Sequence, residues 1–298
     1  MALSRPEVQL RPRSARTGGP RRVSGLLLGR ALAFAALVGL SLLILYPALW
    51  MVSTSLKPDD QVFAYPPRWI PNPIVWENYA RAWASAPFTR YAINSLFYAV
   101  SVTFGTVLSC SLAAYGFSKL RFPGRDFLFL VMLSTMMIPG LVTMVPQYVL
   151  FSKLGWINTY LPLIVPSFFA GAFFTFMLRQ YFLTIPNELL EAARVDGASE
   201  LWIWARVMLP LATPALATVA IFTFDGAWND YVNPLLYLND ERLYTLQVGL
   251  KFFQDANNVQ WQLLMAASVL VLLPVVLIFF VFQKYFVEGA TLTGSVKG

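Results

Sequence analysis

Residue types that carry much of enzyme chemistry are scarce in this sequence. Its 298 residues include no histidine and a single cysteine, Cys110, which lies inside an apolar segment. Histidine is the commonest general base and metal ligand, and one cysteine forms neither a disulfide framework nor a cysteine metal site. Catalytic sites of the Ser-His-Asp and Cys-His kinds are therefore excluded, and we predict that the chain is not an enzyme and binds no metal.

Charged residues are also few. They make up 12% of the sequence and hydrophobic residues 57%, whereas an ordinary soluble domain is about 25% charged. This composition predicts a membrane protein with several spans. The net charge of +7 comes largely from seven arginines in residues 5–30. That stretch has no interleaved aromatic residues, so it favours a basic membrane face over a nucleic-acid partner.

Apolar runs long enough to cross a bilayer follow a basic tail. The tail, residues 1–25, is rich in Arg, Pro, Gly and Ser and is predicted to be disordered. Residues 26–298 are predicted to form one all-α transmembrane domain, because about 20 apolar residues span a membrane as a helix. The first run has 22 residues, too long for a signal-peptide core, so we expect it to be retained. The six predicted spans are 31–52, 91–117, 127–151, 160–178, 211–238 and 263–282.

The distribution of Lys and Arg predicts the orientation of these spans. Cytoplasmic segments of membrane proteins carry an excess of both residues. With both termini in the cytoplasm, 15 of the 22 lie in inner segments and 7 in outer ones. We therefore expect a multi-pass protein of the inner (cytoplasmic) membrane with both termini and the segment 179–210 inside the cell.

Within that inner segment, residues 186–210 predict two short helices joined by a turn. Pro186 suits the first position of a helix, where its missing N–H costs nothing. Glu191 is spaced to pair with Arg194 one turn later. Gly197 suits the left-handed conformation that ends a helix. The second helix is then expected to lead back to the membrane.

One side of the first helix is predicted to be shallow. Leu189, Ala192 and Ala193 share that side at i, i+3, i+4 spacing, and the two alanines would let a partner's backbone approach closely. The second helix is expected to run from Ser199 to Pro210. An amphipathic linker lying on the membrane is the alternative interpretation.

Polar residues interrupt the fifth predicted span. Asp225, Asn229 and Asn233 repeat at i, i+4, i+8 and are expected to share one helical face. Polar groups at membrane depth usually face a protein interior or a watery cavity. Two interpretations stay open, the lining of a solute pathway and hydrogen bonding between helices. The other pathway candidates are Trp228, Asp230 and, on the second span, Asn94.

The segment 186–210 resembles the EAA loop of ABC-importer permeases, which docks onto an ATPase subunit. Further segments are similar to carbohydrate permeases, and 294–298 is similar to the C-terminus of the maltose-type second permease. The resemblance covers residues 26–298. The loop pattern is Glu-Ala-Ala, three residues, Gly, nine residues, an aliphatic residue, one residue, Leu-Pro, carried by Glu191, Ala192, Ala193, Gly197, Val207, Leu209 and Pro210. The other similar segments are 46–57, 94–95, 112–125 and 136–139.

The resemblance implies a type I ABC-importer permease of the carbohydrate-uptake family, with six transmembrane helices and a cytoplasmic coupling helix. Such a subunit forms half of a translocation pathway. Its partners are a second, homologous permease, two ATP-binding-cassette ATPase subunits and an extracytoplasmic solute-binding protein. The residues that the resemblance assigns to ATPase coupling are Glu191, Ala192, Ala193, Asp196, Gly197, Leu209 and Pro210.

The sequence contains no Gly-x-x-x-x-Gly-Lys-Ser/Thr loop to cradle a nucleotide. We therefore expect this chain to bind no cofactor and ATP with magnesium to be hydrolysed by partner subunits. The expected solute is a sugar or sugar derivative. An ABC importer for a non-sugar solute is the alternative. A further one is an ion-driven secondary transporter that works through Asp225 and Asp230 and needs no ATPase.

Overall fold

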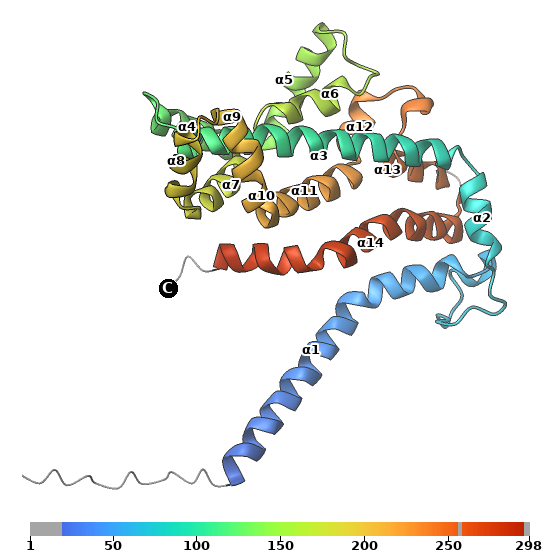
Figure 1. The fold of residues 1–298 in the computed structure, drawn as a ribbon. Helices are drawn as coiled ribbons and strands as arrows, with labels where there is room; N and C mark the ends of the chain where they lie inside the picture. Colours follow the sequence, from blue (N-terminus) through green and yellow to red (C-terminus); the bar gives the residue numbers. More distant parts are fainter. Residues whose placement is uncertain (1–19, 256–257, 295–298) are drawn as a thin grey trace, which may run out of the picture. The chain divides into compact units, whose positions relative to one another are not determined.

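The computed structural model describes residues 20–255 and 258–294 (Figure 1). These residues are helical almost throughout, apart from one short antiparallel strand pair, β1 (Gln254–Asp255) and β2 (Asn258–Val259). The chain divides into two units, Met1–Trp50 and Met51–Gly298. Residues 1–19, which hold most of the predicted disordered tail, lie outside the described residues, as do 295–298.

Four helical segments are long and apolar enough to cross a membrane. The first two are α1 (Pro20–Ser55) and α3 (Phe88–Lys119). The third, Leu161–Thr184, consists of α6 (Leu161–Ile164), η3 (Val165–Phe168) and α7 (Ala172–Thr184). The fourth lies in α14 (Trp261–Gly294). Since α1 begins at Pro20, residues 20–25 are helical and the prediction of a disordered tail is wrong for them.

The third predicted span consists of two helices at nearly a right angle. α4 (Arg125–Ser134), extended by η2 (Thr135–Met137), meets α5 (Gly140–Lys153) at 99°. Pro139 disfavours the helical conformation of the residue before it, and Ile138 accordingly has a ψ of 116°. The helix therefore breaks where the sequence places Ile-Pro.

A second bent pair of helices begins before the fifth predicted span and overlaps its first part. The stretch Glu200–Leu211 meets α11 (Thr213–Trp228) at 84°. If each bent pair is one span, the described chain has six spans. The prediction of one helix over 211–238 is wrong, because α11 ends at Trp228, and three residues separate it from α12 (Val232–Tyr237).

Local side-chain bonds account for that interruption. The side-chain amide of Asn229 donates to the carbonyl of Asp225 at 3.1 Å. The backbone N–H of Asn233 donates to the carboxylate of Asp230 at 3.2 Å. Such bonds offer the backbone an alternative to helical pairing. The i, i+4, i+8 face expected for Asp225, Asn229 and Asn233 is therefore split between two elements.

The remaining elements are short. Two of them, α8 and α9, form the polar segment between the fourth and fifth apolar regions. The full set is η1 (Asp59–Gln61), α2 (Glu77–Ala84), α8 (Asn187–Val195), α9 (Glu200–Ile203), the π-helix η4 (Trp204–Met208), α10 (Leu209–Leu211), η5 (Glu241–Leu243), α13 (Leu246–Gly249) and η6 (Leu250–Phe253).

Helix α3 is the central element of the second unit. It packs along α11 and α7, beside which it runs in Figure 1. Its first half, with Tyr91 and Tyr98, belongs to one core cluster, which includes Trp228 of α11. Its second half, with Cys110 and Tyr115, belongs to a second cluster. One helix therefore connects the two cores.

Close packing against α3 depends on a glycine. A Cβ at Gly105 would overlap Ser167 Oγ and would lie 2.8 Å from the ring of Phe168, both on η3. Real Cβ atoms do not approach other atoms so closely, so a side chain here would force α3 and η3 apart. Glycine thus leaves room for the side chains of Ser167 and Phe168 to pack against α3.

The segment between α1 and α3 is held by a buried amide. Asn78, on α2, is 1% exposed. Its side-chain nitrogen donates to the carbonyls of Ser55 and Lys57 at 2.9 and 2.8 Å. The N–H of Val75 adds a bond to the carbonyl of Leu56 at 2.9 Å. These bonds satisfy backbone groups that would otherwise be buried without partners.

Candidate functional site

The first candidate site is the segment from α8 to α10. α8 begins at Asn187, one residue after Pro186, which has the extended conformation of an N-cap. The helix is amphipathic: Leu190 is 1% exposed and packs in the second core cluster, whereas Leu189 is 48% exposed. Ala192, on the predicted shallow side, is exposed as well. One face of α8 is therefore anchored and the opposite face is open.

A left-handed glycine ends α8, as the sequence predicts. Gly197 has a φ of +83°. Its N–H donates to the carbonyl of Arg194 at 3.0 Å, and the N–H of Ala198 donates to the carbonyl of Ala193 at 3.0 Å. This pair of bonds is the Schellman motif, which satisfies the last carbonyls of a helix. The turn directs the chain into α9, where the hydroxyl of Ser199 accepts the N–H of Trp202 at 3.3 Å.

The predicted pairing of Arg194 with Glu191 is wrong. The guanidinium of Arg194 donates instead to both carboxylate oxygens of Glu200, at 2.8 and 3.2 Å. The hydrogen bond to Glu200 raises the pKa of Arg194 above its usual value, because it stabilises the charged guanidinium. The same carboxylate accepts the hydroxyl of Tyr115 on α3. The turn places Glu200 beside α8, so the more distant acidic residue becomes the partner.

A lysine makes a second attachment of this segment to α3. Lys119, the last residue of α3, donates from Nζ to the carbonyl of Ile185 at 2.6 Å and to Oδ1 of Asn187 at 2.8 Å. Tyr115 and Lys119 lie one turn apart on α3. Polar contacts at Tyr115 and Lys119 therefore connect the segment of α8 and α9 to the end of α3.

The second predicted helix, from Ser199 to Pro210, is not a uniform α-helix. α9 passes into the π-helix η4, then into α10. Leu209 is partly buried and Pro210 is exposed. The π-helix was not predicted. Pro210 offers the one local signal, since it has no N–H to donate to the carbonyl of Arg206.

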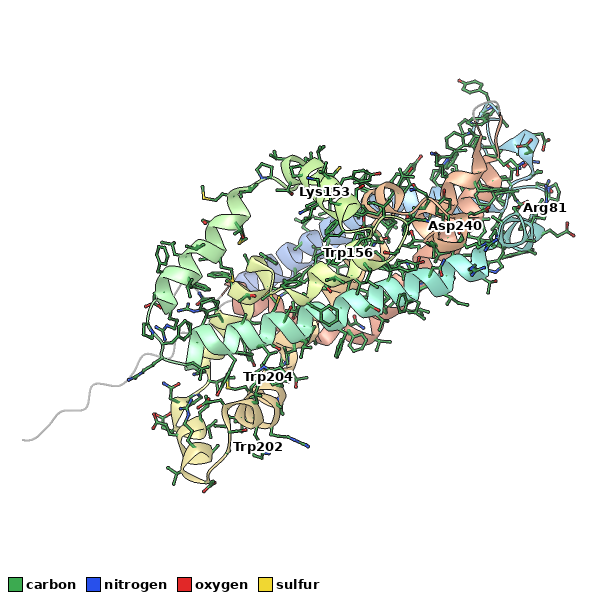
Figure 2. All side chains as sticks on the ribbon, turned by 90° about the horizontal axis from the view of Figure 1, so that it is seen from above. Arg81, Lys153, Trp156, Trp202, Trp204 and Asp240 are labelled. Atoms are coloured by element: carbon green, nitrogen blue, oxygen red, sulfur yellow. The ribbon has the colours of Figure 1, made fainter. Side chains whose placement is uncertain are left out.

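The outward surface of this segment carries large apolar side chains. Val195 is 88% exposed, Leu201 68% and Trp202 51%. Trp202 and Arg81, the latter on α2, lie near opposite ends of α3 (Figure 2). We call this surface the loop surface; its acidic members are the exposed residues Glu188, Glu191 and Asp196. Large exposed apolar side chains beside acidic residues favour a protein interaction site.

The second candidate site is the break between α11 and α12. Asp230 accepts the hydroxyl of Tyr98 at 2.8 Å and the side-chain amide of Asn233 at 3.0 Å. Asn229 donates to the carboxylate of Asp225 at 2.9 Å and accepts from Gln247 at 3.2 Å. Asp225, Asn229 and Asn233 are exposed in the second unit.

Two of the pathway candidates are used in packing. Trp228 is 4% exposed and its indole N–H donates to the carbonyl of Val271 on α14 at 3.0 Å. The side-chain amide of Asn94 donates to the carbonyls of Arg242 and Tyr244, both at 2.9 Å. For these two residues the structure favours hydrogen bonding between segments, the alternative that the sequence left open.

Beside the break lies an open pocket of about 360 Å³. Its polar members come from the segment between the fifth and sixth spans and from α14, and only Tyr231 follows α11 directly. Sequence reasoning missed this pocket, because its residues are far apart in the chain. The lining residues are Tyr231, Gln247, Leu250, Lys251, Gln254, Leu264, Met265 and Ser268. Across residues 20–255 and 258–294, no cluster of three or more Cys, Asp or Glu side chains could hold a metal ion.

Comparison with known proteins identifies the family. The family model described as binding-protein-dependent transport system inner membrane component matches residues 105–291. The chain belongs to this family. It is accordingly an inner-membrane permease component of an ABC importer, and the predicted fold and family are confirmed.

Particular relatives show the same fold over nearly the whole chain. The sn-glycerol-3-phosphate transport system permease protein UgpE of Yersinia enterocolitica is 35% identical over 256 residues, 83% of this chain and 91% of the relative. The trehalose/maltose transport system permease protein MalG of Thermococcus litoralis is 34% identical over 280 residues, 91% of this chain and 98% of the relative. A chain of a bacterial ABC transporter that imports the acidic polysaccharide alginate is similar with a TM-score of 0.76 and 27% identity, covering 94% of this chain and 100% of that chain.

Proposed function

We propose that this permease admits a sugar or sugar derivative and that its loop surface couples the pathway to ATPase subunits. The loop surface carries the proposal. It combines exposed apolar residues such as Val195 and Trp202 with acidic ones, in a chain of the ABC-importer family. Its two contacts with α3, at Tyr115 and Lys119, give a docked subunit a mechanical connection to the bundle.

The assembly that we propose contains a second, homologous permease, two ATP-binding-cassette ATPase subunits and an extracytoplasmic solute-binding protein. ATP and magnesium are bound by the ATPases, and this chain binds no cofactor. ATP binding by the partners favours the arrangement in which the loop surfaces approach each other. ATP shifts the equilibrium between the two arrangements of the transporter only if it binds more tightly to one of them. The docking of the ATPases on the loop surface is the contact that links their ATP-bound form to one arrangement of the permeases.

We propose a cytoplasmic location for both termini and for the loop surface. The excess of Lys and Arg in the inner segments supports it. The bond of Lys119 to Asn187 also supports it, because it joins two of the predicted inner segments at one end of the bundle. The polar break at Asn229 is separated from that end by the length of α11.

The sugar assignment draws on the polar break and the pocket beside it. Asn229, Asn233 and Gln247 offer amide donors and acceptors of the kind that bind hydroxyl groups. The trehalose/maltose relative supports the same substrate class. A solute with a phosphate or carboxylate is the second candidate, favoured by the exposed Lys251 in the pocket and by the glycerol-3-phosphate relative.

Two matched glycine variants test the coupling role. Gly197 and Gly155 have φ values of +83° and +69°, and an added Cβ at either meets no atom within 4 Å. Replacing either by Leu costs roughly 1–2 kcal/mol of backbone strain, so the two variants should lose similar stability. The importer, reconstituted in proteoliposomes with its partners, is assayed for ATP-driven uptake and for binding-protein-stimulated ATP hydrolysis.

We expect Gly197→Leu to lower both activities at least about tenfold, the effect of losing roughly 1.4 kcal/mol of docking free energy. Gly155→Leu should retain both activities, because it lies between α5 and α6, away from the loop surface. Normal stimulated ATP hydrolysis in Gly197→Leu would contradict coupling through this turn. Uptake by the chain without ATPases, abolished by an uncoupler, would instead support the ion-driven alternative.

A solute panel separates the two substrate candidates. The panel contains a neutral disaccharide, a sugar acid and glycerol 3-phosphate, each tested with the wild type and with Lys251→Gln. Uptake of the neutral sugar that is unchanged by the substitution supports the sugar assignment. Uptake restricted to the anions and lost in Lys251→Gln supports the second candidate.

A further inference from the structure

A basic pocket lies where α3 turns into α4. It has a volume of about 370 Å³ and is lined by Arg121, Phe122, Gly124, Arg125, Asp126 and Phe127. The pocket is remote from the polar break. It lies just after the last residue of α3, whereas the break contacts Tyr98 in the first half of that helix. Nothing in the coupling role requires it.

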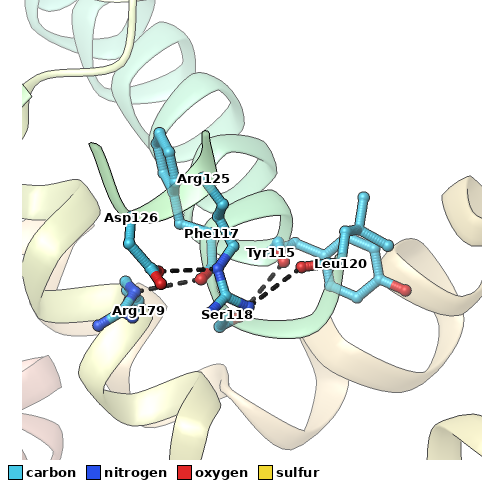
Figure 3. A network of polar contacts seen from close by, with 7 residues as sticks. All are labelled: Tyr115, Phe117, Ser118, Leu120, Arg125, Asp126 and Arg179. Atoms are coloured by element: carbon cyan, nitrogen blue, oxygen red, sulfur yellow. Dashed lines mark hydrogen bonds and ion pairs between the residues drawn. The ribbon is translucent and has the colours of Figure 1, made fainter. Parts of the chain in front are cut away.

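The pocket has an excess of positive charge. Figure 3 shows Arg125 held in position: it pairs with Asp126 at 3.0 Å and donates to the carbonyl of Leu120 at 3.3 Å. Arg179 lies next to Asp126 in Figure 3 and donates to the carbonyl of Phe117 at 3.2 Å. Arg121 is exposed and makes no ion pair or hydrogen bond with any described residue. The guanidinium groups of Arg125 and Arg179 therefore lie near the carboxylate of Asp126, and Arg121 adds a further positive charge to the lining of the pocket.

The backbone adds to this potential. Gly124 precedes α4 with a φ of +78°, and no side chain caps the first turn of the helix. The N-terminal end of a helix carries a partial positive charge. Together with Arg121 and Arg125, it favours an anionic group in the pocket.

An apolar surface continues directly from the pocket along α4. Phe127 is 68% exposed and Leu130 64%, and α4 is the first helix of the apolar pair that bends by 99° before α5. A small soluble anion would make no favourable contact with this apolar surface. A membrane lipid has its phosphate and its acyl chains in the same order along the helix.

We propose that this pocket binds the phosphate of an anionic glycerophospholipid, with Arg121 and Arg125 as the phosphate ligands and the acyl chains along α4. The contact of Lys119 with Asn187 puts the pocket at the same end of the bundle as the loop surface. By the charge distribution that end is cytoplasmic, and basic pockets at the cytoplasmic ends of spans suit anionic head groups.

The test measures lipid retention by the full-length chain. The protein is purified from nanodiscs of equimolar phosphatidylglycerol and phosphatidylcholine, and bound lipids are counted by native mass spectrometry. Arg121→Gln is the main variant, since Arg121 supports no contact within the fold. Arg121→Lys keeps the charge. Arg81→Gln removes an exposed arginine on α2, near the other end of α3.

We expect the wild type to retain phosphatidylglycerol selectively and Arg121→Gln to lose about fivefold of that selectivity, the effect of one basic residue at an anionic membrane surface. Arg121→Lys should keep most of it and Arg81→Gln all of it. Equal retention by wild type and Arg121→Gln, or an equal loss in Arg81→Gln, overturns the proposal. Displacement of the lipid by millimolar inorganic phosphate would also overturn it, because the pocket would then be a site for a free anion.

Discussion

Tyr115, near the end of α3, donates its hydroxyl to the carboxylate of Glu200 at the first residue of α9. Glu200 also holds Arg194, so one carboxylate joins α3, the end of α8 and the start of α9. α3 in turn reaches the polar break through Tyr98 and Asp230. A single helix thereby contacts both candidate sites, as a coupling element must.

Removal of the Tyr115 hydroxyl should loosen the loop surface. A hydrogen bond to a charged group contributes about 1.5–3 kcal/mol, and Tyr115 is 3% exposed. We expect Tyr115→Phe to accelerate amide hydrogen exchange across 187–203. The control is Tyr160→Phe, which removes a hydroxyl bonded to the carbonyl of Leu243 at 2.6 Å in the other core cluster. Unchanged exchange in 187–203 would show that the bond does not hold the segment.

Two glycines of α3 should respond oppositely to alanine. Gly105→Ala forces a Cβ against Ser167 and Phe168, and overpacking of this kind costs about 1–3 kcal/mol. Gly116→Ala meets no atom within 4 Å and should be neutral or stabilise the helix by roughly 0.5–1 kcal/mol. Thermal unfolding in detergent measures both. A lower melting temperature for Gly116→Ala than for Gly105→Ala would refute the close contact of α3 with η3.

The buried amide of Asn78 should be important for stability. Asn78→Ala removes its bonds to the carbonyls of Ser55 and Lys57. Leaving buried polar groups unpaired costs about 1–3 kcal/mol, so the melting temperature should fall by several degrees. Asn239→Ala is the matched control, since that side chain is exposed. If both variants melt alike, the Asn78 bonds are not structural.

Substitutions of the adjacent residues Trp228 and Asn229 should have different effects, one on stability and the other on transport. Trp228→Phe loses the bond to Val271 and should lower stability by about 1 kcal/mol without changing the apparent Km for solute. Asn229→Leu loses an exposed amide and should raise that Km severalfold while ATP hydrolysis without solute stays unchanged. Uptake kinetics and thermal unfolding of both variants provide the measurement. An unaltered Km in Asn229→Leu would exclude this residue from the pathway.

Some local features of the loop surface were predictable because they depend on neighbouring residues. The start of α8 was predicted to within one residue, at Pro186 instead of Asn187, and its end before the left-handed Gly197 was predicted as well, because both follow from backbone preferences within a few residues. The ion-pair partner of Arg194 was not predictable from the sequence. Glu191 and Glu200 are both close to Arg194 along the chain, and only the turn between α8 and α9 decides which of them pairs with it. The π-helix before Pro210 likewise depends on how η4 packs, with Met208 fully buried.

The same distinction explains the pathway candidates. A polar side chain at membrane depth must find a partner or water, and the sequence shows the need but not the partner. Trp228 donates a hydrogen bond to Val271, 43 residues away in the chain, and Tyr98 donates one to Asp230, 132 residues away. Lys251 and Gln254, by contrast, were missed since nothing local distinguishes them from other residues of an outer segment.

Hydropathy, charge distribution and the spacing of the Glu-Ala-Ala segment by themselves determined that this is an α-helical membrane permease of the ABC-importer family. Long apolar segments predict spanning helices because a bilayer requires backbone hydrogen bonds to be satisfied internally, and a helix does so within one segment. Only the tertiary structure showed where the apolar segments bend. It also showed which polar side chains form hydrogen bonds between packed segments and which stay exposed beside the pocket at the polar break. Those outcomes depend on hydrogen bonds and close contacts between residues far apart in the chain.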